Sequence, residues 1–155
     1  MKLLQTRHVP LAGVLVGGIA LLAITAASAH VRVKPAESKP AMTETYQVTV
    51  PTEGKVSTVR VELVVPDGVE LVSVADADDP HEVRKGEAGT SVITWRGEIL
   101  PGFARQYVFT ARNPRTGSQI SWVAHQYFAD GTVADWADAP GSRRPASVTK
   151  LVVAP

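Results

Sequence analysis

The sequence contains no cysteine, few aromatic residues and almost no excess charge. Without cysteine the chain cannot be a disulfide scaffold, an iron–sulfur protein or a thiolate zinc site, so any metal chemistry must use histidine, carboxylates, amines or methionine. The 16 lysines and arginines nearly balance the 15 aspartates and glutamates and form no basic stripe. This balance argues against a nucleic-acid partner. Aromatic residues make up 6% of the chain, too few to favour a flat aromatic face for a polymeric substrate.

Long apolar runs are also missing, apart from Leu11–Ile24 near the N-terminus. This run follows Lys2 and Arg7 and precedes Ala27-Ser28-Ala29, whose small residues suit a cleavage site. The pattern is typical of a secretory signal peptide spanning residues 1–29. Glycines interrupt the run, which is shorter than the ~20 residues of a permanent membrane span. We therefore expect an exported protein, periplasmic or extracellular, without a permanent membrane anchor.

Removing residues 1–29 leaves residues 30–155, with 14 basic and 15 acidic side chains. This length suits one compact domain with a single core. Short stretches of alternating apolar and polar residues recur between turn signals, and no segment has a sustained helical period. The pattern predicts an all-β, immunoglobulin-like β-sandwich of about nine short strands. The expected strands are Val31–Lys34, Tyr46–Val50, Val59–Val65, Val69–Val74, Ser91–Trp95, Gln106–Ala111, Gln119–Gln126, Thr132–Trp136 and Ser147–Val153.

Three segments between these strands are predicted from composition. Asp130-Gly131 is typical of a tight hairpin turn. The most polar stretch, Ala75–Ala88, is expected to be a surface excursion, and Ala139–Ala146 an exposed loop. Both loops are therefore placed outside the sheets.

Cleavage after Ala29 would make His30 the new N-terminus. An N-terminal histidine offers its α-amine and its ring Nδ1 to one metal ion in a six-membered chelate. The α-amine has a pKa of about 8, so its deprotonation to bind metal costs little at neutral pH. Copper(II) is first in the divalent affinity series and favours tetragonal nitrogen and oxygen ligands. The alternative is that signal cleavage leaves a histidine there by chance.

A glutamate near the first hairpin could supply a carboxylate ligand to a metal ion bound by His30. If Val31–Lys34 pairs antiparallel with Tyr46–Val50, His30 lies beside the end of the second strand, directly before Glu53. Glu37 lies at the opposite, turn end of this hairpin, and Glu62 is expected to be a half-exposed residue within a strand. Glu53 is therefore the preferred ligand, with Glu37 and Glu62 as alternatives. A solvated turn residue is the competing interpretation of Glu53.

Other candidate residues point to simpler roles. His81 is close to several aspartates, but the segment lacks the glycine and terminal glutamate of a calcium loop, which favours a solvated acidic loop. His125 lies in a strand pattern and is expected to be a hydrogen-bonded sheet residue. There is no nucleophile elbow or phosphate loop, so no enzyme activity is predicted.

The three tryptophans divide into two groups. Trp95 and Trp122 lie in strand patterns and are predicted to pack in the core or between the sheets. Trp136 follows the expected hairpin and is flanked by Asp135 and Asp138, so we expect it to be more exposed. An exposed tryptophan can mark a binding surface.

Five motifs follow one another along the chain after the predicted signal peptide. They are His30-Val31-Arg32-Val33-Lys34-Pro35-Ala36-Glu37, Val50-Pro51-Thr52-Glu53, Ser57-Thr58-Val59-Arg60-Val61-Glu62, Pro66-Asp67-Gly68-Val69, and Gln126-Tyr127-Phe128-Ala129-Asp130-Gly131 followed by Trp136. In their order and spacing these motifs resemble the bacterial YcnI-like copper-binding family, and the first and last are the most specific.

The resemblance implies a domain spanning residues 30–155 that binds copper through a mono-histidine brace. In this family the brace consists of the N-terminal histidine, a glutamate and a tryptophan near the metal. It implies His30 and Trp136 here, with Glu53 chosen on the hairpin argument. The family is associated with copper-handling partners of the CopC and CopD types, and with copper chaperoning or acquisition.

Two other functions fit the same sequence. An oxidative enzyme of the lytic polysaccharide monooxygenase kind also begins with a chelating histidine, but needs a second imidazole from His81 or His125. A metal-free exported interaction domain would make His30 incidental. The first alternative predicts a second histidine beside His30.

Overall fold

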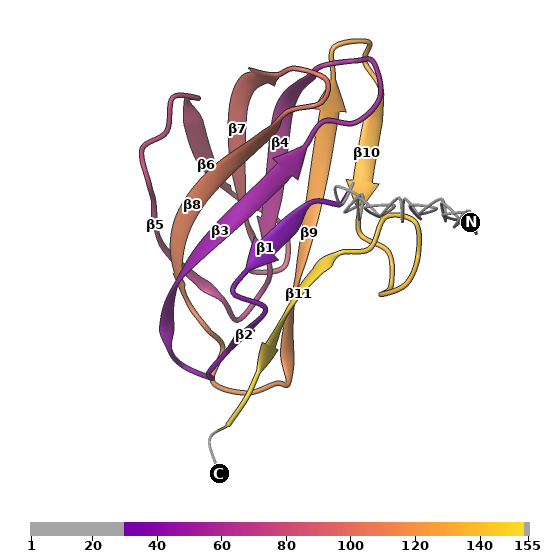
Figure 1. Cartoon of the computed structure of the whole chain (residues 1–155). Coiled ribbons are helices and arrows are strands. Elements are labelled where there is room, and N and C mark those ends of the chain that lie inside the picture. Colours follow the sequence, from indigo (N-terminus) through magenta and orange to yellow (C-terminus); the bar gives the residue numbers. More distant parts are fainter. Residues whose placement is uncertain (1–29, 154–155) are drawn as a thin grey trace, which may run out of the picture.

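The computed structural model describes residues 30–153, so the predicted signal peptide lies outside the described residues (Figure 1). These residues form eleven strands and no helix, which confirms the all-β prediction; no helix that could cross a membrane occurs among them. The strands are β1 (Arg32–Lys34), β2 (Glu37–Ser38), β3 (Thr43–Pro51), β4 (Thr58–Val65), β5 (Glu70–Val74), β6 (His81–Lys85), β7 (Ser91–Ile99), β8 (Ala104–Arg112), β9 (Gln119–Phe128), β10 (Val133–Trp136) and β11 (Ser147–Leu151).

The strands form two sheets that face each other across one core (Figure 1). The smaller sheet has the order β1-β3-β8-β5, and the larger has the order β2-β11-β9-β4-β7-β6, with β10 also paired to β9. Strands β11 and β10 pair with successive parts of β9, residues 119–122 and 124–127. The chain between β10 and β11 therefore leaves the sheet before it returns.

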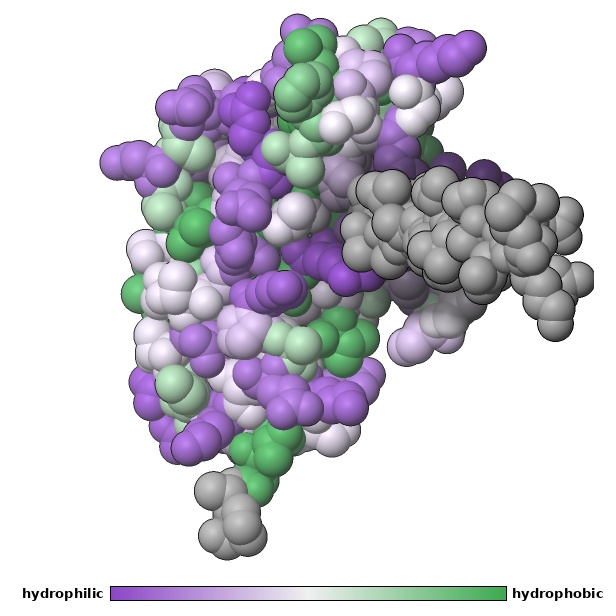
Figure 2. All heavy atoms as spheres, in the orientation of Figure 1, coloured by the Kyte–Doolittle hydropathy of each residue, from purple (hydrophilic) through white to green (hydrophobic). Residues whose placement is uncertain are grey.

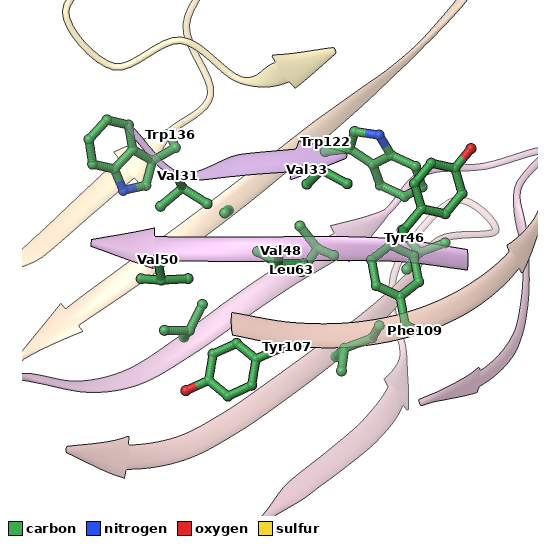
Figure 3. Close-up of a cluster of buried hydrophobic side chains, with 14 of the residues drawn as sticks. Val31, Val33, Tyr46, Val48, Val50, Leu63, Tyr107, Phe109, Trp122 and Trp136 are labelled. Atoms are coloured by element: carbon green, nitrogen blue, oxygen red, sulfur yellow. The ribbon is translucent and has the colours of Figure 1, made fainter. Parts of the chain in front are cut away.

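The core forms because alternate residues of each strand point between the sheets. In β3, Tyr46, Val48 and Val50 are fully buried, whereas the residues between them are partly exposed. Trp95 and Trp122 are also buried, which confirms their predicted core positions. Figure 3 shows the cluster with Trp136 and Val31 at one end, and Tyr46, Phe109 and Trp122 at the other. The surface in Figure 2 is mostly hydrophilic, with apolar residues in small groups.

Two strands were not predicted from the sequence. Strand β6 lies within Ala75–Ala88, so the prediction that this whole stretch is a surface excursion is wrong. All five residues of β6 are exposed, because the strand pairs with β7 at the edge of the larger sheet through its backbone. Strand β2 has two residues and pairs parallel with β11. Neither segment has the apolar alternation that identifies a half-buried strand.

Strand β1 connects the two sheets at one side of the sandwich. It pairs antiparallel with β3, as the hairpin argument predicted. On its other side, the Val33 N–H donates to Ser147 Oγ at 2.8 Å, and Thr149 Oγ1 donates to the Pro35 carbonyl at 2.8 Å. Both hydroxyls belong to β11 of the larger sheet. The first described strand is thus fixed on both sides, which determines where His30 lies.

The hairpin between β9 and β10 is also as predicted. The Gly131 N–H donates to the Phe128 carbonyl at 3.0 Å, and Gly131 has a φ of 84°, a conformation that glycine adopts without steric cost. Asp130 accepts hydrogen bonds from both the N–H and the hydroxyl of Thr132. These hydrogen bonds lower the pKa of Asp130. The turn sets the register that brings Trp136 opposite Ala124.

Candidate metal site

The register of β1 and β3 places His30 at the end of β3. Arg32 lies opposite Thr49 and Val33 opposite Val48, and continuing this register puts His30 opposite Pro51. His30 is half-buried, and it lines a cavity of about 550 Å³ between β1 and the chain segment that leads into β11. The histidine therefore starts the described fold directly beside the strand that leads to Glu53.

The His30 imidazole contacts the Trp136 indole edge to face. Their ring centroids lie 5.6 Å apart with an interplanar angle of 63°. Figure 1 shows the corresponding segments side by side, with the start of β1 next to the end of β10. The structure thus brings together two of the three residues named from the sequence.

Trp136 is more exposed than Trp95 and Trp122, as expected, but with only 7% of its surface accessible it is still a buried residue. Strand β10 alternates, so Ala134 and Trp136 point inward while Val133 and Asp135 point outward. On the outer face, Asp135 Oδ1 and His125 Nδ1 share a hydrogen bond of 2.6 Å. The acidic neighbour Asp135 therefore does not indicate whether Trp136 is exposed, because the two side chains lie on opposite faces of the sheet.

Glu53 and Trp136 line the same cavity, which has a volume of about 320 Å³. Glu53 follows the end of β3 and is exposed. The adjacent Thr52 is buried and is fixed by two backbone hydrogen bonds to the loop between β7 and β8, with Phe103 and Gly102. The carboxylate thus lies on an anchored segment, on the cavity that the tryptophan lines.

The two alternative glutamates lie elsewhere. Glu62 is on β4 opposite His125, on the outer face of the larger sheet, where its Oε2 accepts a hydrogen bond from the Tyr127 hydroxyl at 3.0 Å. Glu37 is on β2, which pairs with β11, and lies beside Lys150. Neither residue lines a cavity with His30 or Trp136. The choice of Glu53 over Glu37 and Glu62 therefore has support from the cavity lining.

The remaining described histidines lie away from His30. His125 bonds Asp135 on the outer face, as predicted for a hydrogen-bonded sheet residue, and His81 starts β6 at the far edge of the larger sheet. Over residues 30–153, no three histidine, cysteine, aspartate or glutamate side chains come together as a metal-binding group.

The acidic segment before β6 is not uniformly solvated, contrary to the prediction. Asp79 is buried, and it accepts hydrogen bonds from the Tyr107 hydroxyl at 2.7 Å and from Arg105 Nη1 at 3.0 Å. Burial is the main cause that raises the pKa of Tyr107, and the hydrogen bond to Asp79 raises it further. This carboxylate therefore attaches the segment to β8 and has a structural role.

Sequence reasoning missed Gln126, which lies beneath the candidate site. Only 1% of its surface is accessible, and its Oε1 accepts a hydrogen bond from Trp136 Nε1 at 3.1 Å. Its position offers a signal: it points inward in β9, where the alternate residues Ala124 and Trp122 are apolar core residues. A polar side chain at an inward position of a strand requires buried hydrogen-bond partners.

The cavity also has a basic rim. Arg143 and Arg144 line it together with Glu53, and both are exposed, in agreement with the predicted loop over Ala139–Ala146. Within the described part of the chain, none of these three residues takes part in an ion pair. The cavity therefore combines one carboxylate, two guanidinium groups and an indole. The guanidinium groups stay protonated and cannot bind a metal ion, whereas the Glu53 carboxylate and the His30 imidazole are oxygen and nitrogen donors that suit a transition metal.

Comparisons with known proteins agree with this architecture. The chain is 35% identical over 139 residues to the copper-binding protein CutI of Bacillus subtilis, covering 86% of this chain and 68% of the relative. A solved protein from Nocardia farcinica, described as having an immunoglobulin-like fold, superimposes with a TM-score of 0.70 at 19% identity, covering 81% of this chain and 100% of that one. A cohesin from Archaeoglobus fulgidus matches with a TM-score of 0.51 at 12% identity, covering 80% and 91%.

These structural likenesses confirm the immunoglobulin-like β-sandwich. The family model that matches the chain, described as Domain of unknown function (DUF1775), spans residues 27–151 and so includes His30, Glu53 and Trp136. With the family model and the Bacillus relative in agreement, the chain belongs to the DUF1775 family, the YcnI-like family that its sequence motifs resemble.

Proposed function

We propose that this chain is an exported copper-binding protein that binds copper(II) through His30 at the N-terminus of the processed chain. The observation that carries the proposal is the contact of the His30 imidazole with Trp136, which in turn lines a cavity together with Glu53. The copper-binding name of a relative 35% identical to this chain supports the choice of metal. Periplasmic or extracellular location follows from the signal peptide predicted for residues 1–29.

The residues fit copper(II) by the chemistry of their donors. Processing after Ala29 would free the α-amine of His30, which with the ring Nδ1 supplies two nitrogen ligands from one residue. Glu53 supplies a carboxylate oxygen, and the resulting nitrogen and oxygen set suits tetragonal copper(II). The Trp136 indole restricts water on one side of the imidazole, and its face can interact with a soft cation such as copper(I). The chain's role is thus to bind the ion and shield it.

We further propose that the chain delivers or acquires copper and is not an enzyme. A histidine-brace oxidative enzyme needs a second imidazole at the metal, whereas His125 bonds Asp135 on the outer face of the larger sheet and His81 starts β6 at the far edge of that sheet. Copper-handling proteins of the CopC and CopD types are the proposed partners. The exposed position of Glu53 on the open cavity suits an ion that must leave the site again.

The test is a copper(II) titration of two forms of the chain that both begin at His30, one with a free α-amine and one with the α-amine acetylated, read by electron paramagnetic resonance. We expect a one-to-one tetragonal signal with nitrogen couplings in the first form. In the second form the α-amine is an uncharged amide that no longer binds metal, so we expect the signal to be lost and the affinity to fall at least about tenfold, which corresponds to about 1.4 kcal/mol.

The variant His30→Ala, processed to the same N-terminus, is the matched control, since it keeps an α-amine and lacks the imidazole. Equal copper affinity in the free and acetylated forms would contradict the brace. A metal-free interaction domain would bind no stoichiometric copper in either form.

A further inference from the structure

Gln126 forms the floor of the cavity that Glu53 and Trp136 line. It lies on β9 opposite Ala134 of β10, so it is the inward neighbour of Trp136 across the strand pair. Its Oε1 accepts the indole N–H of Trp136 at 3.1 Å, and the amide is almost completely buried. This hydrogen bond limits rotation of the indole ring, which contacts the His30 imidazole edge to face.

The other end of the same amide reaches the strand that leads to Glu53. Gln126 Nε2 donates to the Pro51 carbonyl at 2.9 Å and to Thr58 Oγ1 at 2.7 Å. Thr58 Oγ1 in turn shares a hydrogen bond of 2.7 Å with Thr52 Oγ1. Both threonines are fully buried. One side chain therefore connects β10 with the end of β3 and the start of β4, on either side of the loop that contains Glu53.

A buried indole in this protein does not by itself require such a partner. Trp95 is fully buried in the same core, and its Nε1 has no hydrogen-bond partner among the described residues. Burying an amide is costly unless its groups are paired, and an apolar residue at position 126 would leave the Trp136 N–H, the Pro51 carbonyl and the Thr58 hydroxyl without this partner. The amide of Gln126 therefore has a function beyond the satisfaction of one N–H group: it sets the relative position of three segments.

We propose that Gln126 is the positioning residue of the candidate copper site. It fixes the plane of the Trp136 indole against His30 and fixes the Pro51 carbonyl, which lies opposite His30 in the β1–β3 register. The site is thereby preformed before the metal arrives. This inference rests on the proposed function, since it assigns Gln126 a role at the same site.

The first measurement needs no copper. In the processed, metal-free chain, nuclear magnetic resonance follows the indole N–H signal of Trp136 in the native protein and in Gln126→Met, which keeps the side-chain length without the amide. We expect the signal to shift and its hydrogen exchange to accelerate in the variant. An unchanged signal would overturn the proposal, because Gln126 would then not restrain the ring.

The second measurement is copper(II) affinity. Residues that orient metal ligands typically change affinity by about 10- to 100-fold when replaced, and we expect Gln126→Met to weaken copper(II) binding by that factor. The matched control is Asn113→Leu. Asn113 is a buried amide that donates to Ser38 Oγ and the Lys39 carbonyl at the opposite end of the sandwich. We expect it to lower the melting temperature similarly and to leave copper affinity within about twofold.

Should Gln126→Met not fold, Thr58→Val tests the same connection with a smaller change. It removes one of the two acceptors of Gln126 Nε2, leaves the Pro51 carbonyl as the other, and preserves the shape of the side chain. We expect a smaller loss of copper affinity in the same direction. Native affinity in a folded variant would overturn the positioning role alone, whereas absence of copper binding in the native chain would overturn the proposed function itself.

Discussion

At the scale of single residues, the three candidate carboxylate ligands, Glu37, Glu53 and Glu62, differ mainly in the side chains that surround them. Glu53 is exposed on the cavity of Trp136 and has no ion-pair partner among the described residues. Glu62 accepts the Tyr127 hydroxyl and lies 3.9 Å from both Arg60 and Arg84. A carboxylate that already has partners loses them when it binds a metal, whereas Glu53 loses none.

We expect Glu53→Gln to weaken copper(II) binding at least about tenfold, equivalent to about 1.4 kcal/mol, because the substitution removes the anionic oxygen ligand. The melting temperature should stay unchanged, since the side chain is exposed. Calorimetric titration of the processed chain measures both the affinity and the stoichiometry.

Glu62→Gln and Glu37→Gln are the controls for this prediction, as the two alternatives considered from the sequence. Both should retain native copper affinity. A loss confined to either control would move the carboxylate ligand away from the cavity.

At the scale of elements, the segment between β5 and β6 depends on close approach to β7. Asp79, buried at the end of this segment, reaches Tyr107 and Arg105 of β8 across the backbone of Gly97 in β7. A Cβ atom at Gly97 would overlap the Asp79 carboxylate. Glycine is therefore required at position 97 of β7, because the Asp79 carboxylate occupies the space that a side chain would fill.

We expect Gly97→Ala to lower the free energy of unfolding by about 1–3 kcal/mol, the usual cost of overpacking a filled site. Urea unfolding gives the value. In the background of Asp79→Ala the same substitution should cost much less, because the overlapping carboxylate is gone, and the difference is the coupling between the two positions. Additive losses would show that Gly97 is needed for another reason.

At the scale of the whole molecule, tyrosine ionisation should limit stability in alkali. Burial raises the pKa of Tyr107 above its ordinary value of 10.0, and the hydrogen bond to Asp79 raises it further. The folded chain thus keeps a proton that the unfolded chain loses. This contribution is complete below about pH 10 and is lost as the pH rises above it. Burial raises the pKa of Tyr46 as well, so both residues act in the same direction.

We expect the free energy of unfolding to fall more steeply above about pH 10 in the native chain than in Tyr107→Phe. The variant should start lower at neutral pH, because Asp79 loses a buried donor. Urea unfolding at a series of pH values measures both effects. Parallel curves for the two proteins would contradict the assignment to Tyr107.

How far the whole fold follows from sequence depends on the range of the interactions. Alternating apolar residues identified the longer strands, because burial of one face is a local property of each strand. The edge strands β2 and β6 lack that alternation and form through pairing with distant strands. The antiparallel hairpin likewise put His30 beside the end of β3, whereas the network of Gln126 with Trp136, Pro51 and Thr58 joins segments whose proximity no local pattern encodes.

The hydrogen bond from the Val33 N–H to Ser147 Oγ spans 114 residues. A contact this distant in the chain closes a long loop, and an otherwise assembled sandwich offsets the entropy cost of closing it. The strand that positions His30 is held by β3 on one side and by the last strand of the domain on the other. We expect a chain that lacks β11 to hold this strand, and with it His30, on one side only. A metal ion that binds at His30 would bind the folded chain and not the unfolded chain, and would therefore raise the free energy of unfolding.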